Sequence, residues 1–249
     1  MIRNTFKGLS YYSRATSMLL RHNLWMYFIV PTISALLLVF TVFKTRSGFV
    51  DKVQDWLGNI YPDTWFFAEQ IEKVLSLLGG ALGEIFVWLM LVILMKHIVM
   101  IIASPFMSLL SERIEQIVTG KKSTGFKLDK FFSDILRGLR VALRLLVREL
   151  FWSFLIFLLS FFLPPLTAIL LFLVQAYYGG AANMDFTLER FYSYRGSVAF
   201  MKAHKGAAIG NGIPYIAMLM TIFGFLIALP LSTAAATLHV LDIIEDEDI

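Results

Sequence analysis

Residues 24–43 form a block of twenty residues without a charged side chain, and they read LWMYFIVPTISALLLVFTVF. As an α-helix with a rise of about 1.5 Å per residue, this block is about 30 Å long, the thickness of the hydrocarbon core of a bilayer. Pro31 predicts a kink or break inside it, because proline lacks the N–H of a helical hydrogen bond. The block exceeds a signal-peptide core and precedes no small-residue cleavage site, so we expect a retained transmembrane helix.

Composition extends this prediction to the rest of the chain. Of its 249 residues, 58% are hydrophobic and 16% are charged, whereas soluble domains carry about 25% charged residues. The apolar residues come in long blocks that one soluble core could not hide, which predicts an all-α integral membrane protein. The chain has no cysteine, which excludes disulfides, thiolate metal sites and cysteine nucleophiles.

Three further apolar blocks follow the first. Residues 85–103 are interrupted by Lys96 and His97 but are long enough to span a membrane. Residues 150–178 and 213–241 are too long for upright helices, and they are divided at Pro164-Pro165 and at Pro230. This pattern predicts two proline-split helical hairpins that enter the membrane only partway. A tilted helix in each place is the alternative.

The chain is therefore predicted to form a single membrane domain, 1–249, with two long transmembrane helices and two hairpins. Its expected parts are an N-terminal amphipathic segment (1–23), a first transmembrane helix (24–43), an external loop (44–73), a second transmembrane helix (85–103), cytoplasmic helices including an amphipathic segment (104–149), hairpin 1 (150–178), a cytoplasmic connection (179–212), hairpin 2 (213–241) and an acidic tail (242–249). With this topology the three segments rich in Lys and Arg lie on one side of the membrane, and the positive-inside rule makes that side cytoplasmic. They are the N-terminal segment, the segment after the second span and the segment between the two hairpins. The N-terminus is then cytoplasmic.

Four arginines form a stripe before the third apolar block. Arg137, Arg140, Arg144 and Arg148 recur every three or four residues, so on a helix they share one face. One interpretation is an amphipathic helix on an anionic leaflet, with about 1 kcal/mol of attraction per arginine. The other is an anion-collecting surface at the mouth of a pathway, because guanidinium groups match oxyanion geometry. The two interpretations are compatible.

Three ionisable residues lie in or beside apolar blocks. Glu149 adjoins the third block, so we expect its carboxylate to form a structural ion pair with a nearby arginine. Lys96 and His97 lie within the second block and are functional candidates for that reason. Alternatively, both extend their polar ends to the interface, since Ala103 ends the block shortly afterwards.

Enzyme motifs fail where they are sought. The stretch TGKKST at 119–124 has no glycine at the first position of a phosphate loop, where Glu115 stands. The four histidines have no metal-ligand spacing, and HExxH and GxSxG are absent. We therefore expect no enzyme activity, catalytic residue, metal, cofactor or nucleic-acid partner.

The stretch IIASPFMSLLSERIEQIVTG at 101–120 resembles the signature of the CysZ family of bacterial sulfate-uptake membrane proteins, which is related to the eukaryotic etoposide-induced-protein family. Further similarities are FKGLSYYSRA at 6–15, Pro31, Arg140, Arg144, Arg148-Glu149 and Asp185. The resemblance implies two membrane-crossing helices plus two partial hairpins. It also implies a multi-pass protein of the bacterial inner membrane that admits sulfate, works as a homo-oligomer and contacts membrane lipids.

One departure from this family concerns the anion site. Family members carry a Gly-hydrophobic-Arg turn before the first span, and the matching residues here are Asn23, Leu24 and Trp25. The arginine is missing. Arg21 and His22, one turn earlier, are the candidate replacements, and the chain is similar to a divergent member of the family.

Two functions compete on these observations. The first is an anion permease or channel for sulfate or a similar ion, with the arginine stripe at its mouth. The second is a membrane-organising, lipid-binding or assembly protein of the same fold without transport activity. The test from sequence is whether the polar side chains of the two hairpins converge inside the protein or face lipid. These are Ser153, Ser160, Thr167, Gln175, Ser232, Thr233 and Thr237.

Overall fold

The computed structural model describes residues 2–38, 40–41, 44, 81–120, 128–159, 163–221 and 223–247. Nearly all of these residues are helical, and none of them lies in a strand. The predicted all-α class is therefore confirmed for the described part of the chain. Apart from Lys44, the expected external loop lies outside it.

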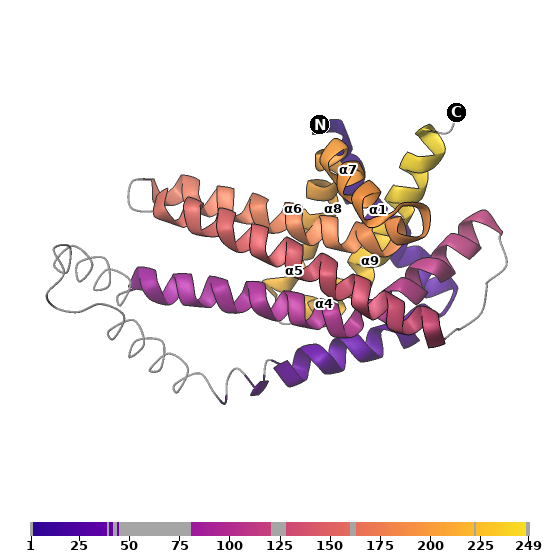
Figure 1. Cartoon of the computed structure of the whole chain (residues 1–249), viewed down its shortest axis with the longest axis horizontal. Coiled ribbons are helices and arrows are strands. Elements are labelled where there is room, and N and C mark those ends of the chain that lie inside the picture. The colour runs from indigo at the N-terminus through magenta and orange to yellow at the C-terminus, as the bar shows by residue number, and fades with distance from the viewer. Residues whose placement is uncertain are drawn as a thin grey trace, which may run out of the picture.

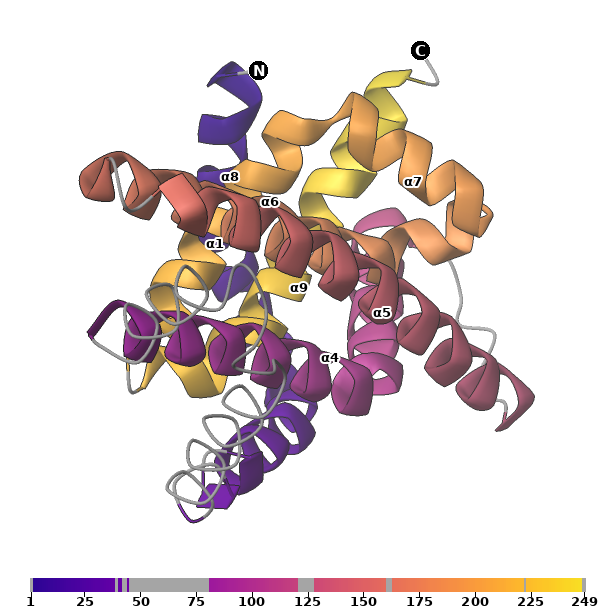
Figure 2. The ribbon, with the colours of Figure 1, turned by 60° about the vertical axis from the view of Figure 1, so that its left-hand side comes forward.

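The helices form two groups in space. In chain order they are α1 (Ile2–Arg21), the 3-10 helix η1 (Leu24–Phe28), α4 (Ala81–Thr119), α5 (Leu128–Leu158), α6 (Pro164–Phe191), α7 (Tyr194–Ala203), α8 (Lys205–Leu219) and α9 (Gly224–Glu247). Helix α4 and the antiparallel pair α5 and α6 run along the long axis, whereas α1, α7, α8 and α9 gather toward one end (Figure 1, Figure 2). The two chain ends lie on the same side, and α1 is joined to α9 by the Tyr11 hydroxyl, which donates to Asp242 over 2.6 Å.

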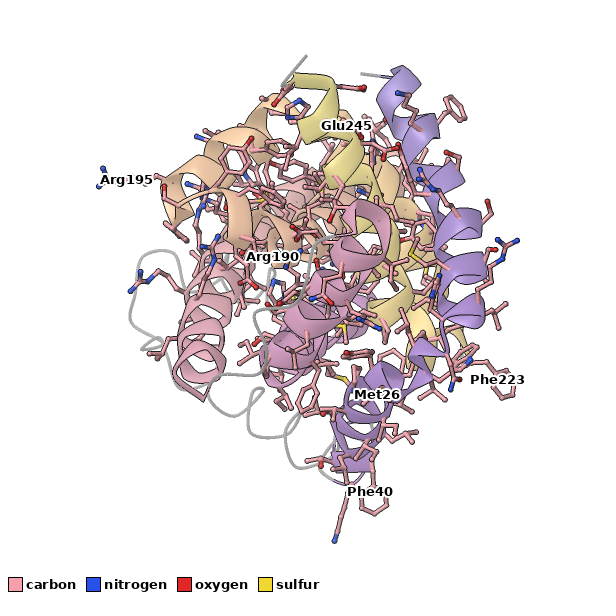
Figure 3. The ribbon with its side chains drawn as sticks, turned by 90° about the vertical axis from the view of Figure 1, so that its right-hand side faces the viewer. Met26, Phe40, Arg190, Arg195, Phe223 and Glu245 are labelled. Carbon is pink, nitrogen blue, oxygen red and sulfur yellow. The ribbon has the colours of Figure 1, made fainter. Side chains whose placement is uncertain are left out.

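In the described part of the chain, three helices are long and apolar enough to cross a membrane: Ile93–Thr119, Pro165–Phe191 and Gly224–Glu247. The apolar helix Leu24–Leu38 is shorter. Large apolar side chains also face outward, as Met26, Phe40 and Phe223 do in Figure 3. In a membrane these side chains face lipid, so their apolar surface is not exposed to water. The chain is thus a membrane protein, while the combination of two long spans with two partial hairpins stays a prediction.

Glycines bring α8 against its neighbours. A Cβ atom on Gly210 would lie 2.4 Å from the Thr5 carbonyl oxygen of α1, and one on Gly212 would lie 1.7 Å from the Ala176 carbonyl oxygen of α6. Neither position can hold a larger residue unless the backbones separate. The small-residue pattern of Gly206 and Gly210, GAAIG, predicts such a contact, and the structure confirms it at Gly210.

The chain does not reverse where Pro230 predicts. Helix α8 ends at Leu219 and α9 begins at Gly224, so the chain reverses before Pro230, which lies inside α9. A proline in a helix leaves the carbonyl four residues earlier without its donor. Here that carbonyl belongs to Leu226, and the Thr32 hydroxyl donates to it over 3.0 Å. The helix therefore continues through Pro230.

Pro105 is accommodated in α4 in the same way. The carbonyl left without a donor is that of Ile101, and the Ser104 hydroxyl donates to it over 2.9 Å. By contrast, α6 begins at Pro164, as the paired prolines predict. Helix α5 is continuous from Leu128 to Leu158 and so crosses the expected boundary at 149/150.

Candidate functional site

A buried ion pair joins the three helices of the long group. Lys96 Nζ of α4 donates to Glu149 Oε1 of α5 over 2.5 Å and to Gln175 Oε1 of α6 over 2.8 Å. The Lys96 and Glu149 side chains are 1% and 0% exposed. Lys96 therefore does not extend to the interface, and the ion-pair partner of Glu149 is a lysine rather than the expected arginine.

His97 lies beside this pair. Its Nδ1 is 2.9 Å from the Ile93 carbonyl oxygen, which places the proton on Nδ1, while Nε2 lies 3.6 Å from Glu149 Oε2. Among the described residues, these last two atoms have no hydrogen-bond partner, and the same holds for Ser153 Oγ and Gln175 Nε2. A cavity of about 10 Å³ borders Lys96, which is room for about one water molecule. The cluster is thus polar, buried and incompletely satisfied.

A second charged cluster surrounds Arg137 of α5. Its Nη2 donates to the Ser197 hydroxyl over 3.0 Å and lies 3.7 Å from Asp185 Oδ1, and its Nε lies 3.7 Å from Glu189 Oε2. Arg137 Nε and Asp185 Oδ1 are buried without a hydrogen-bond partner in the described part. Another cavity of about 10 Å³ is lined by Ser104, Asp185 and Glu189. Arg137 Nη1 also donates to the backbone carbonyls of Glu189 and Tyr192 over 3.5 and 3.4 Å, so the guanidinium bonds a hydroxyl and two carbonyls while both carboxylates stay beyond hydrogen-bond distance.

Hydroxyl groups continue the polar contacts toward the end of α4. Ser111 Oγ lies 2.8 Å from Thr187 Oγ1 of α6 and 2.9 Å from Thr237 Oγ1 of α9. Beyond them Arg190 donates to Ser111 over 2.8 Å and to Glu115 over 2.6 Å. Arg190 lies amid neighbouring helices in Figure 3. These contacts close the interior at this end.

Together these groups form what we call the polar seam, which follows one face of α4. Its α4 members are Lys96, Ser104, Ser108, Ser111 and Glu115. They cover about 28 Å at the rise of an α-helix, close to the thickness of the hydrocarbon core. The seam holds the cations Lys96, Arg137 and Arg190 and the carboxylates Glu149, Asp185, Glu189 and Glu115. Its cations are therefore matched by protein carboxylates.

The four arginines of the stripe do not share one environment. Arg137 turns inward to the polar seam, whereas Arg140 and Arg148 are exposed. Arg144 is half-buried, with its guanidinium carbon 5.4 Å from the centre of the Tyr194 ring. The stripe thus has one interior member and three at or near the surface.

Arg21 and His22 are exposed at the end of α1. The next residue, Asn23, has φ 54° and ψ 45°, a left-handed conformation that asparagine tolerates better than most residues. The family resemblance aligns Asn23 with the glycine of the Gly-hydrophobic-Arg turn, and a left-handed conformation at this position agrees with that alignment. The structure brings neither Arg21 nor His22 into the polar seam.

The polar side chains of the expected hairpins face inward. Ser153, Thr167, Gln175, Ser232, Thr233 and Thr237 are all buried, while Ser160 lies outside the described residues. They do not line one lumen. Gln175 joins Lys96, Thr237 joins Ser111, and Ser232 lies 2.8 Å from the Tyr12 hydroxyl.

Sequence reasoning singled out Thr237 but missed its hydroxyl partners Ser111 and Thr187, and it missed the Arg190–Glu115 pair. One signal was present: Ser104, Ser108, Ser111 and Glu115 recur every three or four residues along α4. Thr187 on α6 gave no such signal.

Apolar helices long enough to cross a membrane, with charged side chains paired between them, define a helical membrane protein, and ionisable residues in such an interior are candidates for function. Residues 11–234 match the family described as Sulfate transporter CysZ/Etoposide-induced protein 2.4. The chain belongs to this family, as the sequence resemblance indicated, and the family description supports a general role in membrane transport. The comparison with curated proteins gives no match.

Proposed function

We propose that the protein is an inner-membrane permease or channel for sulfate or a similar oxyanion. Arg137 carries the proposal. Its guanidinium lies inside the bundle with two carboxylates at 3.7 Å, beyond hydrogen-bond distance, and its Nε lacks a hydrogen-bond partner among the described residues. A tetrahedral oxyanion would satisfy such a guanidinium with short charge-assisted hydrogen bonds. Asp185 and Glu189 then hold the position that the transported anion takes.

The structure corresponds to a closed state in this proposal. The cavity beside Asp185 and Glu189 has a volume of about 10 Å³ and cannot hold sulfate. At this level α5 lies close to α4, since a Cβ atom on Gly138 would be 2.8 Å from Ser104 Oγ. Transport therefore requires α4 and α5 to separate near Gly138. Arg137 then exchanges a carboxylate for the anion.

Other cations have supporting roles. Arg140, Arg144 and Arg148 raise the local anion concentration at the mouth, because exposed arginines attract oxyanions over about one Debye length. Arg21 and His22, beside the left-handed turn at Asn23, are the candidates for a second anion contact. The protein acts as a homo-oligomer with its N-terminus in the cytoplasm.

The test is uptake of radiolabelled sulfate into liposomes that contain the purified protein. Wild-type protein should give uptake above that of empty vesicles, and similar oxyanions should compete. Because Arg137→Gln alone would add an uncompensated negative charge beside Asp185, the informative variant is Arg137→Gln/Asp185→Asn, which leaves the net charge of the interior unchanged. It should lose uptake. The exposed Arg195→Gln is the matched control and should retain it.

Uptake by the paired variant equal to that of wild type would overturn the role of Arg137. No uptake by folded wild-type protein would overturn the sulfate proposal. That result would favour the alternative function, a membrane-organising, lipid-binding or assembly protein of the same fold without transport activity. The Arg140→Ala/Arg144→Ala variant separates the surface from the interior: it should reduce the apparent affinity for sulfate and leave the maximal rate near that of wild type.

A further inference from the structure

A groove of about 770 Å³ lies between α5, α6 and the corner of α7 and α8. Its walls include Trp152 and Ile156 of α5 and Leu170 and Leu173 of α6. Trp152 and Leu173 are partly exposed, so the groove opens to the surroundings of the protein. The groove runs along α6, which is long and apolar enough to cross a membrane, and in that setting apolar walls are covered by hydrocarbon chains rather than by water.

One end of the groove is cationic. Lys202, in the last turn of α7, and Lys205, the first residue of α8, line it together with Tyr177 and Tyr178. Both lysines are exposed, and neither forms an ion pair with any residue in the part of the chain that the structure describes. The cations of the polar seam are paired with protein carboxylates, whereas the charges of these two lysines can pair with an anionic ligand.

Helix α5 repeats the same order of side chains along one face. Arg144, Arg148, Trp152 and Ile156 follow each other at four-residue intervals, which stacks them on one side of the helix. The face thus passes from cations to an aromatic ring to an aliphatic chain, the order expected from headgroup to hydrocarbon.

We propose that this groove binds one anionic phospholipid. An acyl chain lies along Trp152 and Leu170, and the phosphate lies between Lys202 and Lys205. A free inorganic anion would use the cations but not the apolar walls. A second copy of this chain would bring its own cations against unpaired lysines. The proposal goes beyond anion transport, and it uses none of the interior residues of the polar seam.

The test measures lipid retention by the purified full chain. The protein is equilibrated in detergent with equal amounts of phosphatidylglycerol and phosphatidylcholine that have identical acyl chains, and the bound lipid is counted by native mass spectrometry. Wild-type protein should retain phosphatidylglycerol preferentially. Lys202→Gln/Lys205→Gln should lower its apparent affinity about thirtyfold, given the attraction of each lysine for an anionic headgroup. The control Lys7→Gln/Arg195→Gln removes two other exposed cations and should leave retention unchanged; Arg195 projects away from the molecule in Figure 3.

A second variant tests the apolar part of the site. Ile156→Trp fills the groove without changing the charge, and it should reduce retention although both lysines remain. Inorganic phosphate at matched ionic strength should not displace the lipid. Equal loss in the lysine variant and its control, equal retention of the two lipids, or displacement by inorganic phosphate would each overturn the proposal. Sulfate uptake is measured separately, so failure of either proposal is recognised without the other.

Discussion

Lys96 Nζ lies 2.5 Å from Glu149 Oε1, and neither side chain is more than 1% exposed. The pair connects α4 to α5 across 53 residues of sequence. Its two opposite charges cancel, which is what permits either of them in an apolar interior. Gln175 supplies one further acceptor from α6.

Removal of one partner should therefore cost more than removal of both. Lys96→Met leaves the Glu149 carboxylate buried without its cation and should lower the free energy of unfolding by about 3–5 kcal/mol. Lys96→Met/Glu149→Leu removes both charges and should recover most of that loss. Denaturant titration in detergent micelles measures the difference. A single variant as stable as wild type would show that water reaches the pair.

Thr32 should be energetically coupled to Pro230. The Thr32 hydroxyl donates to the Leu226 carbonyl, which proline leaves without its helical donor. Thr32→Val should destabilise the protein by about 1–3 kcal/mol, because that acceptor is left unsatisfied. In a Pro230→Ala background the alanine N–H supplies the missing donor, and the same substitution should cost much less. Additive effects in this double-mutant cycle would contradict the assignment.

Gly212 should tolerate no side chain. A Cβ atom there would lie 1.7 Å from the Ala176 carbonyl oxygen, so Gly212→Ala must push α8 away from α6. The expected loss is about 1–3 kcal/mol or more, as for other overpacked sites. Gly196→Ala is the matched control, because its nearest neighbour is a side-chain atom of Tyr192 at 3.1 Å. The thermal midpoints of the two variants in detergent should differ clearly; equal midpoints would refute tight packing at Gly212.

Asp185→Asn should accelerate sulfate uptake if Asp185 competes with the anion for Arg137. The substitution keeps the shape of the side chain but removes one of the carboxylates at 3.7 Å from the guanidinium. The apparent KM for sulfate should fall several-fold. This gain contrasts with the loss of uptake expected of Arg137→Gln/Asp185→Asn. The measurement is initial uptake over a range of sulfate concentrations. A higher KM would indicate that Asp185 positions Arg137 instead of competing with the anion.

Local sequence determined the class of the protein and the start of α6. The long uncharged blocks require a lipid environment, because no soluble core could bury them, and residues 85–103 lie within α4 as expected. The proline pair at 164–165 begins α6, since proline fits the first turn of a helix. The family was also evident from residues 101–120, and the match over 11–234 confirms it.

Tertiary structure decided the pairings and the breaks. Pro230 predicted a break that a hydroxyl 194 residues away removes, by satisfying the Leu226 carbonyl. Glu149 forms its ion pair with Lys96 instead of an arginine. Of the four arginines in the stripe, only Arg137 points inward. Periodicity places side chains on a face of one helix, but it does not say which helix covers that face. Burial makes an unpaired charge costly, so the packing of α4, α5 and α6 selects which charges meet.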